Sequence, residues 1–325
     1  MKPPKLAARI GLLCALLAGL LLLLLIPNVP QGTHLWRELL DAGHAVLFGV
    51  LAAVLLWTAR GHAGFASRSS LSQYLRVGFP LFLFGIATEI IQPYFQRDGE
   101  FIDVFRDTSG ILAALCLIGS LEMPSTGPGG SPWSRIWLLR LAVVLLTVGV
   151  FETTGVWCLA YLHRNQAFPV LASFESRISR QFVRPHQSRC EPLVNHPNVP
   201  NSDWTGWGRI WFDKTEYPGI TIDELRSGWN GFDSLAFELY SPLTVPISLG
   251  LRVEDRKHDY SYNDRFNQEL AVKPGLNRYA FALATIESAP RLRKMNFDDM
   301  GKIWIFGLSP TDTFSIFIGP IALIR

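Results

Sequence analysis

The sequence has few cysteines, four among its 325 residues. Cys14, Cys116 and Cys158 lie in apolar segments, and Cys190 lies in the more polar second half. Their spacing fits neither a disulfide framework nor a zinc site. We therefore interpret the cysteines as small buried hydrophobic residues and expect no metal centre built on them.

An excess of one charge is also missing, since the formal net charge is +3. The basic residues are scattered and form no patch or stripe, which argues against nucleic acid as a partner. The signatures of common catalytic sites are absent as well: there is no G-x-S-x-G elbow, P-loop, H-E-x-x-H or C-x-x-C. The sequence therefore favours binding over catalysis and predicts no cofactor.

Long apolar runs, in contrast, fill the first half of the chain. We expect five membrane spans, at Ile10 to Ile26, Ala42 to Ala59, Val77 to Phe95, Val104 to Leu121 and Ile136 to Leu162. The first run is long for a signal peptide and no small-x-small cleavage pattern follows it, so it is interpreted as an uncleaved helix. Residues 1–163 are thus predicted to form an all-α transmembrane bundle.

The short connections predict the orientation of this bundle, because Lys and Arg next to spans favour the cytoplasmic face. One side receives Lys2, Lys5, Arg9, Arg60, Arg68, Arg76, Arg135 and Arg140, and the other receives Arg37, Arg97 and Arg106. The amino terminus is therefore predicted in the cytoplasm, and everything after His163 outside it. The expected location is the cytoplasmic membrane, with the bilayer as a partner.

Polar side chains gather near the predicted outer surface of the bundle. The cluster consists of Asp41, His44, Glu89, Gln92, Arg97, Asp103 and Asp107. Residues three or four apart on a helix share a face, so three helices can direct these groups into one pocket. Ionisable groups at a membrane are costly unless they are paired, hydrated or functional. Arg97 or Arg106 could neutralise the carboxylates, and the alternative is that the cluster only caps helices and pairs internally.

The same residues carry a family pattern. Asp41-x-x-His44-x-x-x-Phe48, Glu89-x-x-Gln92, Arg97 with Asp103, and Asp107-x-x-Gly110 resemble the VanZ-like membrane proteins over about residues 28–121. Asp107 stands where that family usually has Asn. The resemblance implies a bacterial envelope protein of a glycopeptide-resistance-associated family. It leaves open an enzyme or transport component in which His44, Glu89 and Asp103 act on a lipid-linked substrate at the outer leaflet.

After Leu162 the pattern changes to short alternating runs with turn residues between them. Strands are predicted at Gly208 to Asp213, Ser234 to Tyr240, Val245 to Glu254, Phe266 to Val272, Asn277 to Leu283, Lys302 to Leu308 and Phe314 to Ile324. About eight strands and no long periodic helix predict an all-β sandwich or jelly roll over residues 164–325.

This second half also resembles a known family. Phe174-Glu175, the run from Gly231 to Phe237, Tyr262-Asn263-Asp264-Arg265 and Lys273-Pro274-Gly275 are similar to the galactose-binding-like jelly rolls of carbohydrate-binding modules, over about residues 170–325. The resemblance implies the sandwich fold and sugar binding, although the same fold hosts unrelated binders.

Two places are candidate sugar sites. The first is the connection from Glu254 to Asn267, with Asp255, His258, Tyr262, Asn263, Asp264 and Arg265 as ligand-binding candidates. It offers carboxylates, amides, a guanidinium fork and flat rings, which suit the hydroxyls and apolar faces of sugars. The alternative is a solvated connection that ties down its own turns. Its acidic oxygens could also hold a structural calcium ion, although no ligand spacing for calcium is recognisable.

The second place is an aromatic group made of Trp204, Trp207, Trp211, Tyr217 and Trp229. Such rings either form a stacking platform or pack into a core. Taken together, the sequence predicts a membrane-anchored protein whose sandwich binds a glycan or a cell-wall precursor. A sandwich that docks a protein partner is the remaining alternative.

Overall fold

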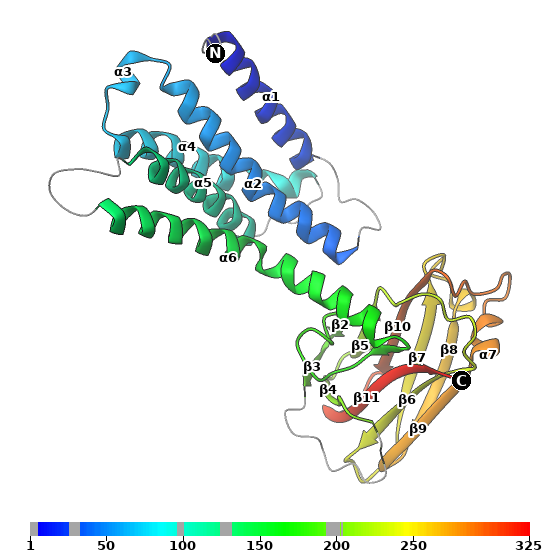
Figure 1. Ribbon diagram of the computed structural model, residues 1–325. Coiled ribbons are helices and arrows are strands. Elements are labelled where there is room, and N and C mark those ends of the chain that lie inside the picture. Colours follow the sequence, from blue (N-terminus) through cyan, green and yellow to red (C-terminus); the bar gives the residue numbers. More distant parts are fainter. Residues whose placement is uncertain (1–5, 26–32, 96–100, 124–131, 193–201, 203) are drawn as a thin grey trace. The chain divides into compact units, whose positions relative to one another are not determined.

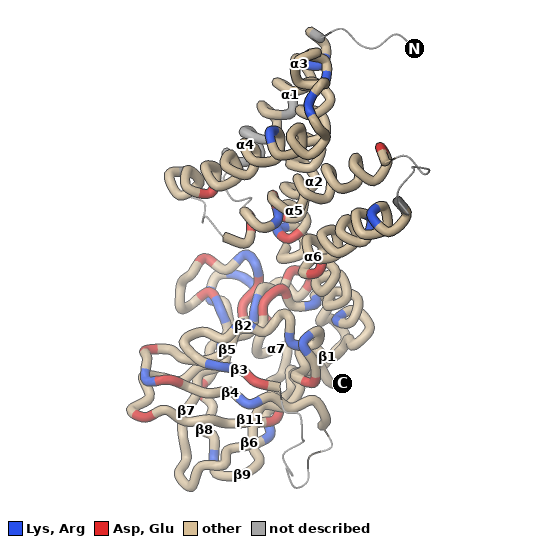
Figure 2. The backbone as a smooth tube through the Cα atoms, turned by 90° about the vertical axis from the view of Figure 1, so that its left-hand side faces the viewer, with Lys and Arg blue, Asp and Glu red and all other residues tan. Residues whose placement is uncertain are grey.

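The computed structural model describes residues 6–25, 33–95, 101–123, 132–192, 202 and 204–325. The chain divides into two compact units, Met1–Gly155 and Val156–Arg325. The first unit is helical and the second consists mainly of two antiparallel sheets (Figure 1). Charged residues are sparse along the helices and frequent in the second unit (Figure 2).

Where the structure describes the helical unit, it shows five long helices at the five apolar runs. Its elements are α1 (Leu6–Leu25), α2 (His34–Ala59), α3 (Ala63–Ala66), α4 (Ser70–Ile91), the 3-10 turn η1 (Gln92–Phe95), α5 (Phe101–Glu122) and α6 (Pro132–Ala167), whose last turns belong to the second unit. The hydroxyl of Thr33 caps α2 by accepting a hydrogen bond from the Trp36 amide, and Ser69 caps α4 in the same way.

Among the described residues, three helical segments are long and apolar enough to cross a membrane: His34–Ala59, Ser70–Tyr94 and Trp133–Ala167. A shorter apolar stretch, Ala7–Gly19, lies in α1. Helix α5 is outside this set, and its sequence includes Asp103, Arg106, Asp107 and Glu122. The five-span topology therefore stays a prediction.

Small residues bring α2 and α5 together. The α-carbon of Gly110 lies so close to α2 that a β-carbon there would overlap the carbonyl oxygen of Ala45. Gly49 meets the backbone of Gly110 from the other side. Next to this crossing, the core contains Phe48, Leu51, Leu56, Val77, Ile111 and Leu115. Close approach of this kind depends on glycine, because a side chain would push the helices apart.

The sequence analysis predicted buried cysteines, but none of the four is fully buried. Cys14 and Cys158 are exposed on their helices, and Cys116 and Cys190 are half-buried. All four are free thiols. Desolvation of the Cys190 side chain raises its pKa to about 11, so this thiol stays protonated and unreactive at neutral pH.

The described part of the second unit contains eleven strands, all paired antiparallel. They are β1 (Val170–Ala172), β2 (Val183–His186), β3 (Ser188–Pro192), β4 (Gly208–Phe212), β5 (Gly219–Asp223), β6 (Ser234–Ser241), β7 (Ile247–Asp255), β8 (Phe266–Val272), β9 (Gly275–Ala282), β10 (Met300–Gly307) and β11 (Phe314–Ile324). Sheet A has the order β3-β4-β11-β6-β9, with β1 also on β11, and sheet B has the order β2-β5-β10-β7-β8. Short helical turns, η2 (Tyr262–Asp264) and α7 (Leu283–Glu287), interrupt the chain.

The central strand of sheet B buries one face. In β10, Ile303 and Ile305 are fully buried, whereas the alternate residues Trp304 and Phe306 are half-buried. The seven predicted strands are all present, and β8 and β11 have the predicted bounds. The four missed strands, β1, β2, β3 and β5, have three to five residues each and lack a long alternating pattern.

The last turns of α6 pack with the sandwich. The ring of Trp157 is 3% exposed and meets Phe182 edge to face, with 5.5 Å between ring centroids. Tyr161 meets the same Phe182 ring at 5.1 Å. The division at Gly155 therefore precedes the boundary predicted after residue 163, because these helical side chains belong to the core of the second unit.

Candidate functional site

Arg293 organises the connection between β7 and β8, the first predicted sugar site. Its guanidinium donates to Asp255 Oδ1 at 2.8 Å and to Asp264 Oδ1 at 2.7 Å. The Asp255 side chain is fully buried, and its Oδ2 also accepts from the Asn296 amide at 2.7 Å. The hydrogen bonds from Arg293 hold the pKa of Asp264 below its usual value. Arg293 engages oxygens of both carboxylates, which favours the alternative that the connection ties down its own turns.

His258 is also internal to this connection. Its side chain is 3% exposed, with Nδ1 3.0 Å from the carbonyl oxygen of Asp264 and Nε2 3.0 Å from Arg252 Nη2. Such a buried ring positions Arg252 rather than meeting a ligand. His258, Asp259 and Asp264 have potential metal-ligating atoms within 4.8 Å of one another among the described residues. Arg293 already supplies positive charge to Asp264, so the calcium hypothesis gains no support from this group.

The outer part of the connection is open to solvent. Tyr262 is 67% exposed, and the guanidinium carbon of Arg265 lies 5.3 Å from the centroid of its ring. Arg265 Nε donates to Asn267 Oδ1 at 2.8 Å, and the Asn267 amide donates to the carbonyl oxygen of Tyr262 at 2.9 Å. Asn263 is exposed beside them. Three predicted residues, Tyr262, Asn263 and Arg265, therefore lie on an accessible surface.

The predicted tryptophan platform does not exist as one surface. Trp207 and Trp229 are 1% and 0% exposed, and their indole nitrogens donate to the carbonyl oxygens of Trp204 and Arg226. Both rings belong to the sandwich core, which corrects their prediction as sugar-stacking residues. Trp204 is half-buried.

Sheet B carries an aromatic group that the sequence analysis missed. Trp304 and Phe306 project from the outer face of β10, with ring centroids 4.7 Å apart. His186 of β2 meets Trp304 edge to face at 5.6 Å, and Tyr217 meets Phe306 at 5.9 Å. The alternation with Ile303 and Ile305 was the available signal, because residues two apart on a strand share a face.

Glycines leave room for these rings. Gly219 of β5 and Gly250 of β7 are the register partners of Phe306 on either side. A β-carbon on Gly250 would overlap the Phe306 ring, which therefore lies over the bare backbone of β7. Gly250 thus makes space for the Phe306 ring, whereas Gly219 lets β5 approach the β10 backbone at Ile305 and Phe306.

Polar groups border the aromatic surface. The guanidinium carbon of Arg252 lies 5.8 Å from the Trp304 ring centroid, and Arg252 Nε donates to Glu254 Oε2 at 2.5 Å. Asn267 of β8 is the register partner of Arg252 and connects it to Arg265. We name this combined surface the sheet B face; it consists of His186, Tyr217, Arg252, Tyr262, Arg265, Asn267, Trp304 and Phe306. Flat rings beside forked donors and an amide suit a ligand with apolar faces and many hydroxyls.

The helical unit concentrates its polar groups around Arg106, whose side chain is 8% exposed. Arg106 donates to Glu38 at 2.9 Å and to Asp103 at 3.0 Å, and it lies 3.4 Å from Asp41. It also contacts the Thr153 hydroxyl at 3.3 Å. Glu38, which the sequence analysis did not select, is thus part of this ionic cluster, and among the described residues Arg106 pairs with Glu38, Asp41 and Asp103.

The remaining described cluster residues are His44 on α2, Glu89 on α4, Gln92 at the start of η1 and Asp107 on α5. Asp107, Glu89, Gln92 and His44 are all at least nine-tenths buried. Asp107 lies close enough to Asp103 and Glu89 to interact electrostatically with both. Among the described residues, its Oδ1 atom and both polar atoms of the Gln92 amide have no hydrogen-bond partner. Arg97 lies outside the described residues.

Comparisons of the whole chain with known proteins give fold-level similarities. No protein-family model matches it and no curated protein matches it, so the resemblance to VanZ-like proteins stays a prediction. Among solved structures, an exo-β-agarase shows 16% identity over 47% of this chain and 24% of its own length, with a TM-score of 0.39.

Two further matches involve the same half of the chain. A family 11 carbohydrate-binding module from Clostridium thermocellum, in complex with a β-1,3-1,4-mixed-linked tetrasaccharide, shows 10% identity over 48% of this chain and 94% of its own, with a TM-score of 0.36. The CBM22-1–GH10 modules of a xylanase from the same organism, complexed with xylohexaose, show 10% identity over 48% and 28%, with a TM-score of 0.33. With identities of 16% or less and TM-scores below 0.4, these matches carry no argument about function.

Proposed function

We propose that this protein is a membrane-anchored glycan-binding protein whose jelly-roll sandwich binds sugar on the sheet B face. The observation that carries the proposal is the Trp304–Phe306 pair, two half-buried rings with centroids 4.7 Å apart on the outer face of a sheet. Aromatic rings provide a flat apolar surface at small entropic cost, which matches the C–H face of a pyranose ring.

The polar border supports the same ligand class. Arg252 and Arg265 carry forked donors, and the Asn267 amide, which bonds to Arg265 and to the Tyr262 carbonyl oxygen, holds this border in place. The two arginines are linked through Asn267, because Asn267 pairs with Arg252 in the strand register and accepts a hydrogen bond from Arg265. A ligand that stacks on Trp304 would therefore find directional partners for its hydroxyls on the neighbouring strands.

The membrane part of the proposal rests on the three apolar helical segments and on the Lys and Arg asymmetry of the connections. It includes a cytoplasmic amino terminus and a sandwich outside the cytoplasm. The envelope of a bacterium, as the VanZ-like resemblance implies, would then supply a glycan or a cell-wall precursor as ligand.

The test is a glycan array probed with the full chain in phosphatidylcholine nanodiscs, followed by calorimetric titration of a positive glycan. Nanodiscs avoid sugar-based detergents, which would compete for the site.

Trp304→Ala should lower affinity at least tenfold, since buried tryptophans at interfaces contribute strongly. Trp211→Ala is the matched control, because Trp211 is a half-buried tryptophan on the outer face of sheet A. Equal effects of both changes, or binding only of a protein partner, would contradict the proposal.

A second candidate is favoured by the unpaired atoms of Asp107 and Gln92, which are 3% exposed each. Buried polar groups without partners cost free energy and are retained where they serve a ligand or a reaction. In this alternative His44, Glu89 and Asp103 act on a lipid-linked envelope substrate. Glu89→Gln, which preserves shape, would then abolish a resistance or growth phenotype of the intact protein while leaving membrane insertion and glycan affinity unchanged.

A further inference from the structure

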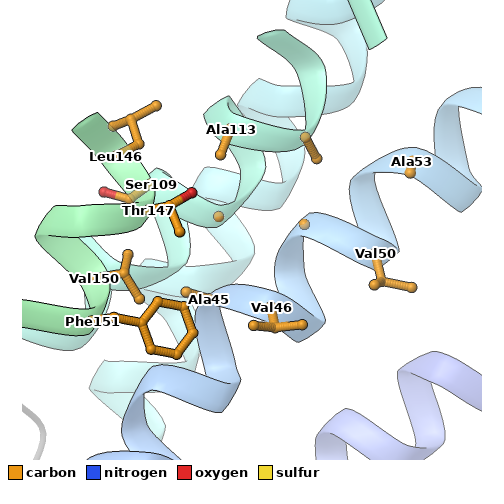
Figure 3. Close-up of a pocket in the computed structure, with 13 residues that line it drawn as sticks. Ala45, Val46, Val50, Ala53, Ser109, Ala113, Leu146, Thr147, Val150 and Phe151 are labelled. Atoms are coloured by element: carbon orange, nitrogen blue, oxygen red, sulfur yellow. The ribbon is translucent and has the colours of Figure 1, made fainter. Parts of the chain in front are cut away.

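An apolar groove lies between α2, α5 and α6 of the helical unit, with a volume of about 310 Å³. Figure 3 shows Val46 and Val50 on one wall, Leu146, Val150 and Phe151 on the other, and Ala113 on α5 between them. Ser109 and Thr147 are its two lining residues with polar side chains. Two hydroxyls in an otherwise apolar lining provide few hydrogen-bond partners for a sugar, a peptide or a nucleotide.

One end of the groove adjoins the ionic cluster around Arg106. On each of the three helices, a groove residue lies about one helical turn from a residue of the cluster. Asp41 lies one turn before Ala45 on α2, and Arg106 lies one turn before Ser109 on α5. On α6, Val150 leads to Thr153, whose hydroxyl contacts Arg106, and to Thr154, whose hydroxyl donates to the Glu38 carbonyl oxygen at 3.4 Å.

The cluster has an excess of negative charge toward solvent. Glu38, Asp41 and Asp103 surround one arginine. The side chains of Glu38 and Asp41 are 23% and 29% exposed, whereas that of Arg106 is 8% exposed. The atoms that an approaching group meets are therefore mainly carboxylate oxygens.

We propose that the groove and the ionic cluster bind an amphiphile with a single alkyl chain and an ammonium head group. The chain lies against α2, α5 and α6, and the ammonium donates to Asp41 and Glu38. A volume at the lower end of known ligand pockets, which span about 300–1,000 Å³, suits one chain better than a diacyl lipid or a ring system. The site is independent of the glycan site on the sandwich.

The probe is radiolabelled dodecylamine, with dodecanol as its uncharged match. Equilibrium dialysis is run against the full chain in phosphatidylcholine nanodiscs, with protein-free nanodiscs as the background for partitioning. Dodecylamine should show one saturable site per chain above this background. Dodecanol should bind at least tenfold more weakly, because it lacks the charge-assisted hydrogen bonds to the carboxylates.

Two kinds of variant separate the head group from the chain. Asp41→Asn should weaken dodecylamine at least tenfold and leave dodecanol unchanged, since it removes one carboxylate and keeps the shape. Ala113→Phe, which fills the groove, should weaken both probes. Leu112→Phe is its matched control, because Leu112 is the neighbouring residue on α5, is 46% exposed and does not line the groove.

The outcomes are decisive in both directions. Equal affinity for the two probes, no saturable component above protein-free nanodiscs, or an Ala113→Phe variant with wild-type affinity would each overturn the proposal. Folding is checked by the thermal transition of each variant without probe. The pair with Asp41, at 3.4 Å, is the longest of the three ion pairs of Arg106, so the fold should tolerate the loss of the Asp41 charge. If Asp41→Asn nevertheless fails to fold, Glu38→Gln provides the same charge test.

Discussion

The ring of Phe306 on β10 lies over the bare backbone of Gly250, its register partner on β7. The absence of a side chain at Gly250 lets this ring spread across two strands of sheet B. Trp304, two residues away on the same face, then has the Phe306 ring on one side and Arg252 at 5.8 Å. The geometry of the sheet B face thus depends on a glycine that itself offers no group to a ligand.

Gly250→Ala should therefore impair glycan binding without unfolding the protein. The new methyl group overlaps the outer end of the Phe306 ring, which can rotate away at modest cost. We expect several-fold weaker binding in calorimetric titration and a small change in melting temperature. Ser248→Ala, an exposed change on the same strand, is the control. Wild-type affinity in the Gly250→Ala variant would remove Phe306 from the site.

Arg293→Met should destabilise the sandwich strongly. The change leaves the fully buried Asp255 carboxylate without its main counter-ion, and breaking a buried pair typically costs about 3–5 kcal/mol. For a unit of this size that corresponds to a drop of about 6–20 °C in melting temperature. Lys294→Met removes an adjacent, 76% exposed cation and should cost less than about 1 kcal/mol. Similar melting temperatures for the two variants would contradict this role of Arg293.

The same ion pair predicts how stability depends on pH. Hydrogen bonds from Arg293 lower the pKa of Asp264 in the folded state below its unfolded value of about 3.9. A lowered pKa contributes stability above the unfolded value, and this contribution is lost as the pH falls through the folded value. Urea unfolding of the segment 156–325 between pH 6 and about pH 2 should show this loss. The Arg293→Met variant should lose less, and a parallel decline in both proteins would contradict the assignment.

Much of the sandwich was predictable from sequence because its long strands have recognisable apolar patterns. In β10 buried and half-buried positions alternate from Ile303 to Gly307, and β11 is an apolar run of eleven residues that is buried along most of its length. The short strands β2 and β3 have four and five residues with polar or proline positions, which resemble turns. Their pairing depends on β5 and β4, far away in sequence.

The candidate site was only partly predictable, because burial depends on the fold. Trp207 and Trp304 are equally aromatic in sequence, yet one fills the core and the other faces outward. The presence of Asp255 at the end of β7 and of Asp264 in the following loop suggested ligand contacts. Arg293, almost thirty residues beyond Asp264, instead forms ion pairs with both carboxylates. No local pattern connects an arginine at that distance to its partners.

In the helical unit, Gly110→Ala should be destabilising although alanine favours helices. A β-carbon at this position overlaps the backbone of Ala45, so α2 and α5 must separate. Overpacking of this kind costs about 1–3 kcal/mol. Gly43→Ala is the matched control, since a β-carbon there meets nothing within 4 Å and alanine is the better helix former by about 1 kcal/mol. Thermal unfolding in nanodiscs should therefore move in opposite directions, and equal shifts would contradict the close crossing.

The proposed topology predicts where the sandwich is located in a cell. A reporter fused after Arg325 and active only outside the cytoplasm should be active, because the Lys and Arg residues place the amino terminus inside and five spans reverse the side. The same reporter fused after Met123, following the fourth helix in the proposed topology, should be silent, and a cytoplasmic reporter should give the opposite pair of results. Activity of the external reporter at Met123 and silence at Arg325 would invert the orientation. Identical behaviour at both positions would mean that α6 does not cross the membrane, and the glycan site would then share a compartment with the α5 carboxyl end.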